Sequence, residues 1–294
     1  DKMSYTNVLG VLAGQSATNA SYSNFFGYYA GNNASNVDNS NFLGQNAGDN
    51  ASNADNSNFF GYYAGYQSSN DSNFMGYYAG YNATGAYQSN FFGRSAGSGA
   101  TSANNSNFIG NQAGSGAINA SYSNLFGYQA GKTFTGNNLG SNNIIIGTNI
   151  SLPDSTTNSV NIGGVLFGTN TYATTTGDPS IVARNTGRIG INIVSPAASL
   201  DVSGSTIIRD KLTIYSGTNK TSGVATLTGG TPSTVTVSTT AVATNSIILL
   251  TKQTMTTPGG VVGVTGRTAG TSFVIRSSSN GDTDAVAWFI IGTS

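Results

Sequence analysis

A pair of adjacent apolar residues, followed directly by glycine, recurs along the first half of the chain at nearly constant spacing. The glycines are Gly10, Gly27, Gly44, Gly61, Gly76, Gly93, Gly110 and Gly127. The step is 17 residues except for one of 15 between Gly61 and Gly76. Helical repeats need longer periods of about 33–47 residues. We therefore predict an all-β fold in which each period is one coil of a β-solenoid, built from short strands and turns.

Both positions of the apolar pair carry large side chains in every period. Since neighbouring residues of a strand point to opposite faces, both faces of this strand should avoid water. One face can pack inside the coil, whereas the other needs a partner surface. We predict a homotrimeric interface around a three-fold axis; the alternative is a wide monomeric solenoid that folds over its own second layer. The residues expected to form these core and trimer columns are Phe25, Phe26, Phe42, Phe59, Phe60, Phe74, Phe91, Phe92, Phe108, Ile109 and Phe126.

Polar and small residues recur with the same period. An asparagine precedes each apolar pair, from Asn7 to Asn124. Stacked identical amides can bond to one another along a β assembly, so this column predicts a ladder. An alanine column indicates a place too tight for a larger side chain, and the glycine after it turns the chain. The two residues that follow the first glycine vary between aromatic and polar, and we expect this variable pair to face solvent.

The pattern changes twice further along the chain. The strings "SNNIIIG" (141–147) and "NSVNIG" (158–163) are degenerate coils, so the solenoid should taper off near residue 168. Residues 169–216 are expected to form a neck, with "TIIRDKLTIYS" (206–216) as a strand. From residue 217, alternating β-branched runs separated by turn residues predict an antiparallel β-sandwich. The predicted domains are thus 1–168, 169–216 and 217–294, with the strand from Val286 to Ile291 central in the last.

Composition narrows the possible functions. The chain has 294 residues, of which only 7% are charged, and it contains no His, Cys or Glu. Thiolate metal sites and disulfides are therefore excluded. Eleven Lys and Arg balance eleven Asp, too dilute a basic charge for nucleic-acid binding. No apolar run reaches the roughly 18 residues of a membrane span, and the first residues do not resemble a signal peptide.

The same composition removes most catalytic chemistry. Without His, Cys or Glu, triads, metal–histidine sites and thiolate mechanisms are impossible. Asp282 and Asp284 could in principle form a carboxylate pair for glycoside hydrolysis. Their string "SSNGDTD" is typical of a turn, and a solvated turn is the favoured interpretation. We expect no enzyme, no catalytic residue and no cofactor.

A metal site is not expected either. Aspartates in the inter-strand turns could lend oxygen ligands to Ca²⁺, but the complete acidic loop of a tight site is absent. These aspartates are Asp38, Asp49, Asp55 and Asp71.

Binding chemistry remains in two places. Tyrosines at the variable pair could stack on sugars, or could lie in grooves between chains and add buried area. Loops on a rigid scaffold commonly carry binding, so a receptor site is expected in the loops of the C-terminal domain. The receptor-binding candidates are Thr256, Pro258, Arg267, Arg276, Asn280 and Asp282.

Several strings resemble known fibre proteins. Units such as "NSNFIGNQAG" resemble the "NTAIG-YQAL" arrays of phage and giant-virus fibres, and "NSVNIG" is similar to the "NSVAIG" head repeats of trimeric autotransporter adhesins. Residues 185–214 resemble a segment common in tail fibres, although Asn192-Ile193 stands where Gly-Thr is usual. Residues 234–290 are similar to the terminal head domain of many phage tail fibres. The resemblance implies a parallel homotrimer and host-surface attachment, but no particular ligand.

Together these observations predict the distal part of a trimeric tail fibre, located in a virion tail or an extracellular appendage. Its partners would be two further copies of itself, a cell-surface glycan or protein receptor, and the rest of the fibre or virion at the N-terminal end. No nucleic acid and no membrane insertion are expected. The alternatives are a cellular adhesin or filament subunit, a polysaccharide-cleaving tailspike, and an ice-binding solenoid.

Overall fold

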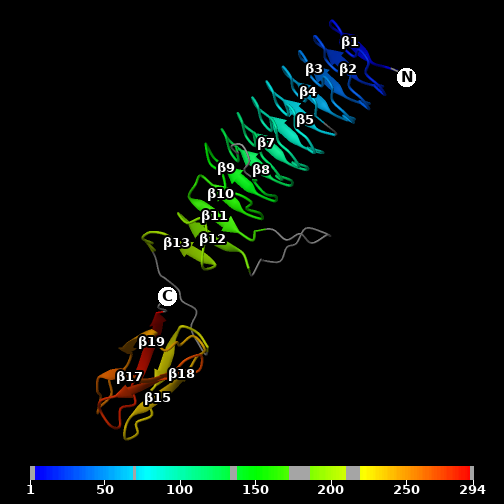
Figure 1. Ribbon diagram of the computed structural model, residues 1–294. Coiled ribbons are helices and arrows are strands. Elements are labelled where there is room, and N and C mark those ends of the chain that lie inside the picture. The colour runs from blue at the N-terminus through cyan, green and yellow to red at the C-terminus, as the bar shows by residue number, and fades with distance from the viewer. Residues whose placement is uncertain (1–3, 69–70, 133–137, 172–185, 210–218, 292–294) are drawn as a thin grey trace. The chain divides into compact units, whose positions relative to one another are not determined.

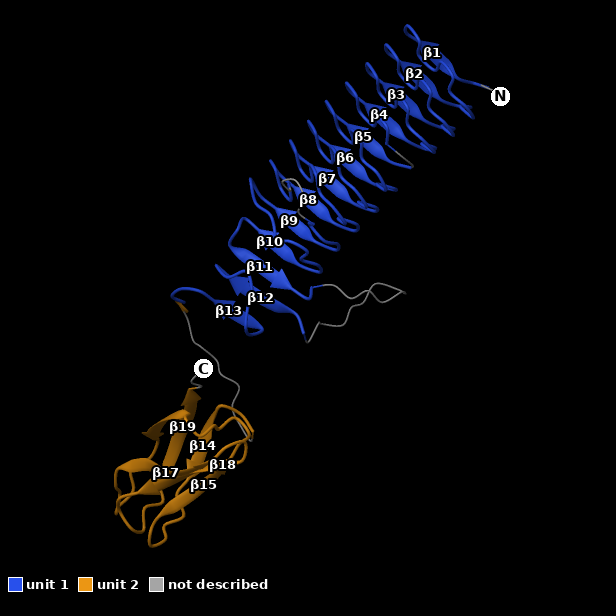
Figure 2. Ribbon diagram, viewed as in Figure 1, with its two compact units in different colours: residues 1–206 blue, residues 207–294 orange. Residues whose placement is uncertain are grey.

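The computed structural model describes residues 4–68, 71–132, 138–171, 186–209 and 219–291, and these ranges contain strands and turns but no helix. The chain divides into two compact units, a solenoid unit of residues 1–206 and a C-terminal unit of residues 207–294 (Figure 2). The all-β prediction, with a β-solenoid followed by antiparallel sheets, is confirmed.

One sheet of short strands runs through the solenoid unit in chain order (Figure 1). Its first ten strands pair in parallel, one strand per coil, with asparagine opposite asparagine through β8. They are β1 (Asn7–Leu9), β2 (Asn24–Phe26), β3 (Asn41–Leu43), β4 (Asn58–Phe60), β5 (Asn73–Met75), β6 (Asn90–Phe92), β7 (Asn107–Ile109), β8 (Asn124–Phe126), β9 (Ile144–Ile146) and β10 (Val160–Ile162). The 15-residue step leaves the register intact, since Asn58 pairs with Asn73.

The middle residue of each strand points into the coil and builds the core. From β2 to β7 this residue is always a fully buried phenylalanine. Successive rings stack, as between Phe59 and Phe74 at 5.1 Å and 8°, and between Phe91 and Phe108 at 4.6 Å and 5°. Buried alanines from the turns fill the rest of the coil interior. The stacked rings therefore form a continuous column along the axis of the unit.

Two polar ladders run beside the aromatic column. The predicted asparagine ladder is confirmed: Asn41 Nδ2 donates to Asn58 Oδ1 at 2.8 Å, and Asn58 Nδ2 donates to Asn73 Oδ1 at 2.7 Å. Sequence reasoning missed a second ladder, formed by the serine before each asparagine. Ser57 is fully buried; its backbone N–H donates to Ser40 Oγ and its own Oγ accepts from the N–H of Ser72, both at 3.1 Å. These hydroxyls satisfy backbone groups that water cannot reach.

Replacing one of these serines should therefore be costly. Ser57→Ala leaves the N–H of Ser72 buried without its acceptor, and we expect the solenoid unit to lose about 1–3 kcal/mol of unfolding free energy. Denaturant unfolding followed by circular dichroism measures this loss. Ser102→Ala, at an exposed position, should change stability by less than about 0.5 kcal/mol. Equal effects of the two substitutions would contradict the ladder.

Glycine is required where successive coils approach most closely. A Cβ on Gly44 would lie 2.5 Å from the carbonyl oxygen of Gly61, and Gly44 has a φ of +136°. Both the contact and the backbone conformation disfavour any other residue.

The variable pair after this glycine is more constrained than predicted. Its second residue is left-handed in each of the first eight coils, as at Asn46 and Tyr63. The expectation that this pair simply faces solvent is wrong at Asn46, which is buried. Its amide Nδ2 donates to Asp49 Oδ2 at 3.1 Å, so hydrogen bonding compensates for the lost water.

The sheet continues beyond the parallel coils. β11 (Leu166–Thr169) is antiparallel to β10 and to β12 (Arg188–Ile191), and β13 (Leu200–Val202) pairs in parallel with β12. The strand predicted over 206–216 is wrong for 206–209, which are not in a strand, and 210–216 lie outside the described residues. No strand neighbour pairs with 206–209 there, so β-propensity alone does not make them a strand.

The C-terminal unit contains two three-stranded antiparallel sheets with a shared core. One sheet has the order β14-β19-β16 and the other β15-β18-β17. The strands are β14 (Ser222–Thr226), β15 (Thr234–Ser238), β16 (Ile247–Lys252), β17 (Val262–Thr268), β18 (Ser272–Ser277) and β19 (Ala285–Ile291). β19 is central in its sheet, as expected, and Trp288 on it packs edge-on against Phe273 of β18.

Candidate functional site

The outward apolar residues of the solenoid strands form a stripe that the chain itself covers only in part. This outward stripe consists of Leu9, Phe26, Leu43, Phe60, Met75, Phe92, Ile109, Phe126, Ile146 and Ile162. Phe26, Met75 and Ile109 keep 38%, 40% and 37% of their surface exposed, whereas the inward phenylalanines keep none. The structure thus places the two predicted apolar columns on opposite sides of the strand. Only the inward column is buried by the chain itself.

Tyrosines of the variable pair stack in short columns where two successive coils both carry them. Tyr62 stacks on Tyr77 at 5.0 Å and 14°, and Tyr63 stacks on Tyr78 at 5.4 Å and 11°. Arg94 lies 5.7 Å from the centre of the Tyr77 ring. One face of each of these rings is therefore covered by the neighbouring tyrosine. Sugar stacking, which needs a free ring face, is thus disfavoured inside these columns.

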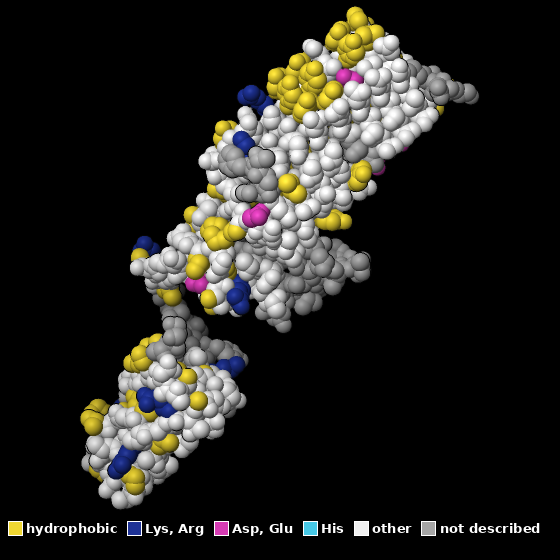
Figure 3. Space-filling model, in the orientation of Figure 1, with side chains coloured by type: hydrophobic (Ala, Val, Ile, Leu, Met, Phe, Trp, Pro, Cys, Tyr) yellow, Lys and Arg dark blue, Asp and Glu magenta, His cyan; other side chains and the backbone are white. Residues whose placement is uncertain are grey.

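On the face drawn in Figure 3, hydrophobic side chains gather over the N-terminal coils.

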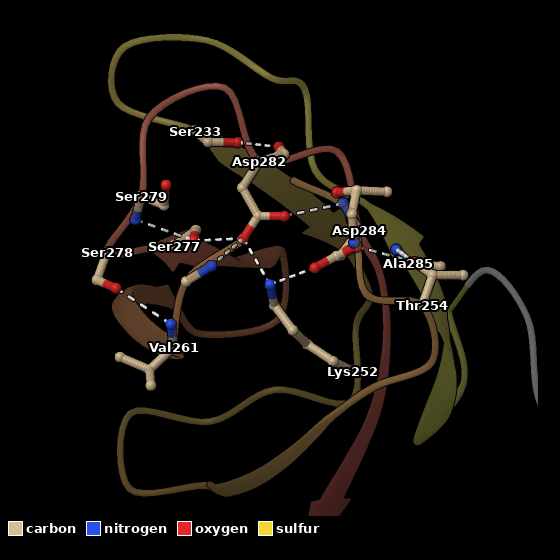
Figure 4. Close-up of polar contacts among 12 residues, drawn as sticks. Ser233, Lys252, Thr254, Val261, Ser277, Ser278, Ser279, Asp282, Asp284 and Ala285 are labelled. Atoms are coloured by element: carbon tan, nitrogen blue, oxygen red, sulfur yellow. Dashed lines mark hydrogen bonds and ion pairs between the residues drawn. The ribbon is translucent and has the colours of Figure 1, made fainter. Parts of the chain in front are cut away.

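At one end of the C-terminal unit, three charged side chains from distant segments meet. Lys252 ends β16, and Asp282 and Asp284 lie in the turn that leads from β18 to β19. Because β16 and β19 pair antiparallel, with Lys252 opposite Val286, the lysine reaches the turn before β19. Figure 4 shows the ammonium group of Lys252 between the two carboxylates. Lys252 Nζ is 2.6 Å from Asp282 Oδ2 and also bonds Asp284 Oδ2.

Asp282 accepts hydrogen bonds at both of its oxygens. Oδ2 accepts from Lys252, from the backbone N–H of Gly260 at 3.0 Å and from Ser277 Oγ at 2.5 Å. Oδ1 accepts from the backbone N–H of Asp284 at 3.0 Å. The side chain is completely buried. Asp282 thereby joins the loop between β16 and β17 to the end of β18 and the start of β19.

Asp284, also completely buried, holds the same loop through its other oxygen. Its Oδ1 accepts from the backbone N–H of Thr256 at 2.6 Å and from Thr254 Oγ1 at 3.2 Å. The expectation that these two aspartates form a solvated turn is wrong. Lys252 and the surrounding N–H and O–H donors replace the water that the carboxylates lose on burial.

Both carboxyl groups are held ionised. Burial alone would raise the pKa of Asp282, but hydrogen bonds from Lys252 and Ser277 outweigh it and hold that pKa well below its usual range. The hydrogen bond from Lys252, helped by Thr256, likewise lowers the pKa of Asp284. Desolvation alone would lower the pKa of Lys252, yet its bonds to the two aspartates raise it. Glycoside hydrolysis needs one protonated carboxyl, so this pair is unsuited to it.

The lowered pKa values predict how the C-terminal unit responds to acid. A carboxyl whose pKa is lower in the folded state contributes stability above its unfolded pKa, near 3.9, and loses it as pH falls toward the folded pKa. We expect the unfolding midpoint of this unit to be constant between about pH 5 and 7 and to fall below about pH 4. The fluorescence of Trp288, the single tryptophan of the chain, reports the transition. A midpoint that stayed constant down to about pH 2 would refute this assignment.

A cavity of about 390 Å³ lies beside this cluster. It is lined by Lys252, Met255, Thr256, Gly259, Gly260, Val261 and Asp284. Four of the six receptor-binding candidates lie in the two segments that the cluster joins. Thr256 and Pro258 are in the exposed loop between β16 and β17, and Asn280 and Asp282 are in the turn before β19.

The other two candidates lie on strands. Arg276 is exposed on β18 and Arg267 on β17. Asp282 differs from all the other candidates because its side chain is buried and its oxygens are already bonded. It can act on a ligand only by positioning the loop.

Sequence reasoning missed Lys252. The only signal was a lysine that ends an apolar run, with two aspartates just before another apolar run. Thirty residues separate Lys252 from Asp282, and only the antiparallel pairing of β16 with β19 brings them together.

The turn aspartates of the solenoid bond to the backbone. Asp38 Oδ1 accepts from the N–H of Ser21 at 2.6 Å, and Asp55 Oδ1 accepts from the N–H of Asp38 at 2.9 Å. In the part of the chain that the structure describes, no group of three acidic side chains is arranged to hold a metal ion. Nor does that part contain any helix that is long and apolar enough to span a bilayer.

The fold and this cluster define a class of protein: a β-solenoid joined to a small antiparallel domain with a loop-bordered cavity. Residues 219–291, which span β14 to β19, match the family model of the K1 capsule-specific polysaccharide lyase, C-terminal domain. A comparison with curated proteins gave no match.

This match corrects one prediction. Absence of His, Cys and Glu led us to expect that the chain is not an enzyme, yet its C-terminal unit is similar to a domain of an enzyme. Composition excludes particular residue types, but it does not exclude membership in an enzyme family. The match covers a C-terminal domain and assigns no catalytic residue to this chain.

Proposed function

We propose that this chain is the distal part of a virion tail fibre or tailspike, assembled as a homotrimer, which attaches the particle to cell-surface polysaccharide. The observation that carries the proposal is the match of residues 219–291 to a domain of a capsule-specific polysaccharide lyase, next to a β-solenoid unit. The matched family acts on a capsule polysaccharide, which favours a glycan over a protein as the receptor.

The outward stripe of the solenoid supports the homotrimer. An apolar stripe that persists over successive coils is a surface that soluble proteins cover by association. Identical chains present identical stripes, so rotational symmetry brings the stripes together and closes the assembly. A trimer also supports attachment, because three weak sites held together bind far more tightly than one.

The cavity beside Lys252 supports a receptor site in the C-terminal unit. Its rim is built from the loop that contains Thr256 and Pro258, and the buried aspartates hold this loop in place. Backbone groups and a threonine hydroxyl are suitable partners for sugar hydroxyls. A loop that is fixed before binding loses little entropy when the ligand arrives.

A direct test measures binding of the full chain to purified K1 capsular polysaccharide and to a panel of other capsule types. The expected result is saturable binding to at least one of them. Thr256→Trp, which fills the cavity, should weaken this binding at least about tenfold, or about 1.4 kcal/mol. Thr236→Trp, on the exposed surface of β15, is the matched control and should bind like the unaltered chain. Absence of binding to any polysaccharide or encapsulated cell would overturn the proposal.

Cleavage of polysaccharide is the second candidate function, and the family match favours it. The same incubations test it. A lyase breaks a glycosidic bond by elimination, which leaves a carbon–carbon double bond that absorbs ultraviolet light, and the polysaccharide becomes shorter. Binding without new absorbance or shortening supports attachment alone, whereas both signals together support a cleaving tailspike.

A further inference from the structure

The outer face of the β14-β19-β16 sheet is apolar. On β19, Val286, Trp288 and Ile290 point into the core, so the alternate residues point outward. The outward residues of the three strands lie beside one another in the pairing register, as with Leu249 opposite Phe289 and Ile247 opposite Ile291. The resulting apolar sheet face consists of Val224, Ile247, Leu249, Ala287, Phe289 and Ile291. Val224, Ile247 and Leu249 are each at least half exposed.

The other sheet of the same unit has a different outer face. There Thr234 pairs with Arg276, Thr236 pairs with Val274, and Ser238 pairs with Ser272. This alternation of buried apolar and exposed polar residues is typical of an antiparallel sheet with one solvated face. The β14-β19-β16 sheet lacks this alternation, because its outer face is apolar as well as its inner face. Its outer face therefore has the composition of a covered surface.

The lack of charge on this outer face indicates what covers it. The apolar sheet face holds no charged residue, and its remaining outward positions are Ser222, Thr226, Thr251 and Ala285. A polysaccharide would find only these three hydroxyls to bond among apolar side chains, and a charged partner would lose its hydration without compensation. The occupant must be apolar and nearly flat. The chain itself presents such a surface, namely this same sheet face.

The solenoid unit supports the same occupant, a further copy of this chain. Its outward stripe is a second apolar sheet surface that the chain leaves partly exposed. Association of identical chains can cover the unpartnered apolar face of each unit. The C-terminal unit also gains from association, because a domain of this size buries only about 60% of its unfolded surface alone.

We propose that the apolar sheet face is the surface through which C-terminal units of three copies of this chain pack on one another. This inference rests on the homotrimer proposed above and specifies where the C-terminal units meet. The polar outer face of the β15-β18-β17 sheet, and the loop beside the cavity, then remain free for a receptor.

The absence of cysteine from the chain makes the inference directly testable. Single cysteines are introduced into the full chain at three places: Leu249→Cys on the apolar sheet face, Thr236→Cys on the polar face of the other sheet, and Met75→Cys on the outward stripe. Each variant is treated with a mild oxidant or a short bis-maleimide and analysed by non-reducing gel electrophoresis. Solution mass and circular dichroism establish that each variant is folded.

The expected result is covalent dimer for Leu249→Cys and Met75→Cys, at several times the yield for Thr236→Cys. Dimer from Met75→Cys without dimer from Leu249→Cys would overturn the inference and leave the homotrimer standing. Absence of dimer from both, with the solution mass of a monomer, would overturn the inference and the homotrimer together. Equal yields from Leu249→Cys and Thr236→Cys would indicate random collision and would also overturn the inference.

Leu249→Lys gives a second measurement that does not depend on cross-linking geometry. A charge in the apolar sheet face should make the C-terminal units separate. Trp288 should then unfold at least about 5 °C lower, while the solenoid transition is unchanged. The matched variant Thr236→Lys should unfold like the unaltered chain. Equal midpoints for Leu249→Lys and Thr236→Lys would contradict the proposed packing.

Discussion

Phe59→Ala is expected to lower the unfolding free energy of the solenoid unit by about 3–5 kcal/mol. Phe59 is completely buried and lies in the middle of the aromatic column, 4.7 Å from the ring of Phe42 and 5.1 Å from that of Phe74. Removing its ring takes away apolar burial and both stacking contacts at once. Coils above and below it cannot move into the space, because the inter-coil hydrogen bonds on either side fix the spacing of the coils. Denaturant unfolding followed by tyrosine fluorescence measures the effect.

Two controls make this prediction specific. Phe59→Leu keeps most of the volume, so it should cost less than about 2 kcal/mol. The transition of Trp288, which lies in the C-terminal unit, should not change in either variant. If Phe59→Ala cost no more than Phe59→Leu, the aromatic column would not be the core of the solenoid.

Lys252→Met should be the most destabilising single substitution of a charged residue in the C-terminal unit. It leaves Asp282 and Asp284 buried and close together without their shared counter-charge, and breaking a buried ion pair in this way is strongly destabilising. We expect the thermal midpoint of Trp288 fluorescence to fall by about 10 °C or more at pH 7. The fall should be smaller near pH 4, where protonation relieves the uncompensated charge.

Neutralising the whole cluster tests whether uncompensated charge causes this loss of stability. The triple variant with Lys252→Met, Asp282→Asn and Asp284→Asn has no buried charge to compensate, so it should regain a large part of the lost midpoint. Arg267→Met removes an exposed charge and should have little effect. A triple variant less stable than Lys252→Met would show that the hydrogen bonds of the carboxylates, and not charge compensation, dominate.

The positions of the strands in the solenoid follow from the sequence because each coil repeats the same requirement. Phe42, Phe59 and Phe74 occupy equivalent positions, and the same neighbours surround each of them. A periodic pattern therefore reports the core directly, and it also predicted the asparagine ladder. The serine ladder was missed because serine is common in turns, and its burial depends on where the neighbouring coil places its backbone.

The sequence predicts contacts between distant segments less well. The string around Asp282 and Asp284 is typical of a solvated turn, and nothing near it in the chain contradicts that interpretation. Lys252 changes the outcome from thirty residues away. Likewise, the apolar run of β19 predicts a strand. Both faces of this strand are apolar, so the pattern alone does not tell which face is inside.

The sequence by itself thus determined the all-β class, the coil period, the inward and outward apolar columns and the asparagine ladder. Each of these depends on local spacing, and in a solenoid the next coil along the chain is also the next coil in space. Tertiary structure alone decided the burial of Asp282 and Asp284, their pairing with Lys252, and the exposed apolar face of the β14-β19-β16 sheet. These features depend on antiparallel strand pairing between segments far apart in the chain, and local spacing carries no information about such pairing.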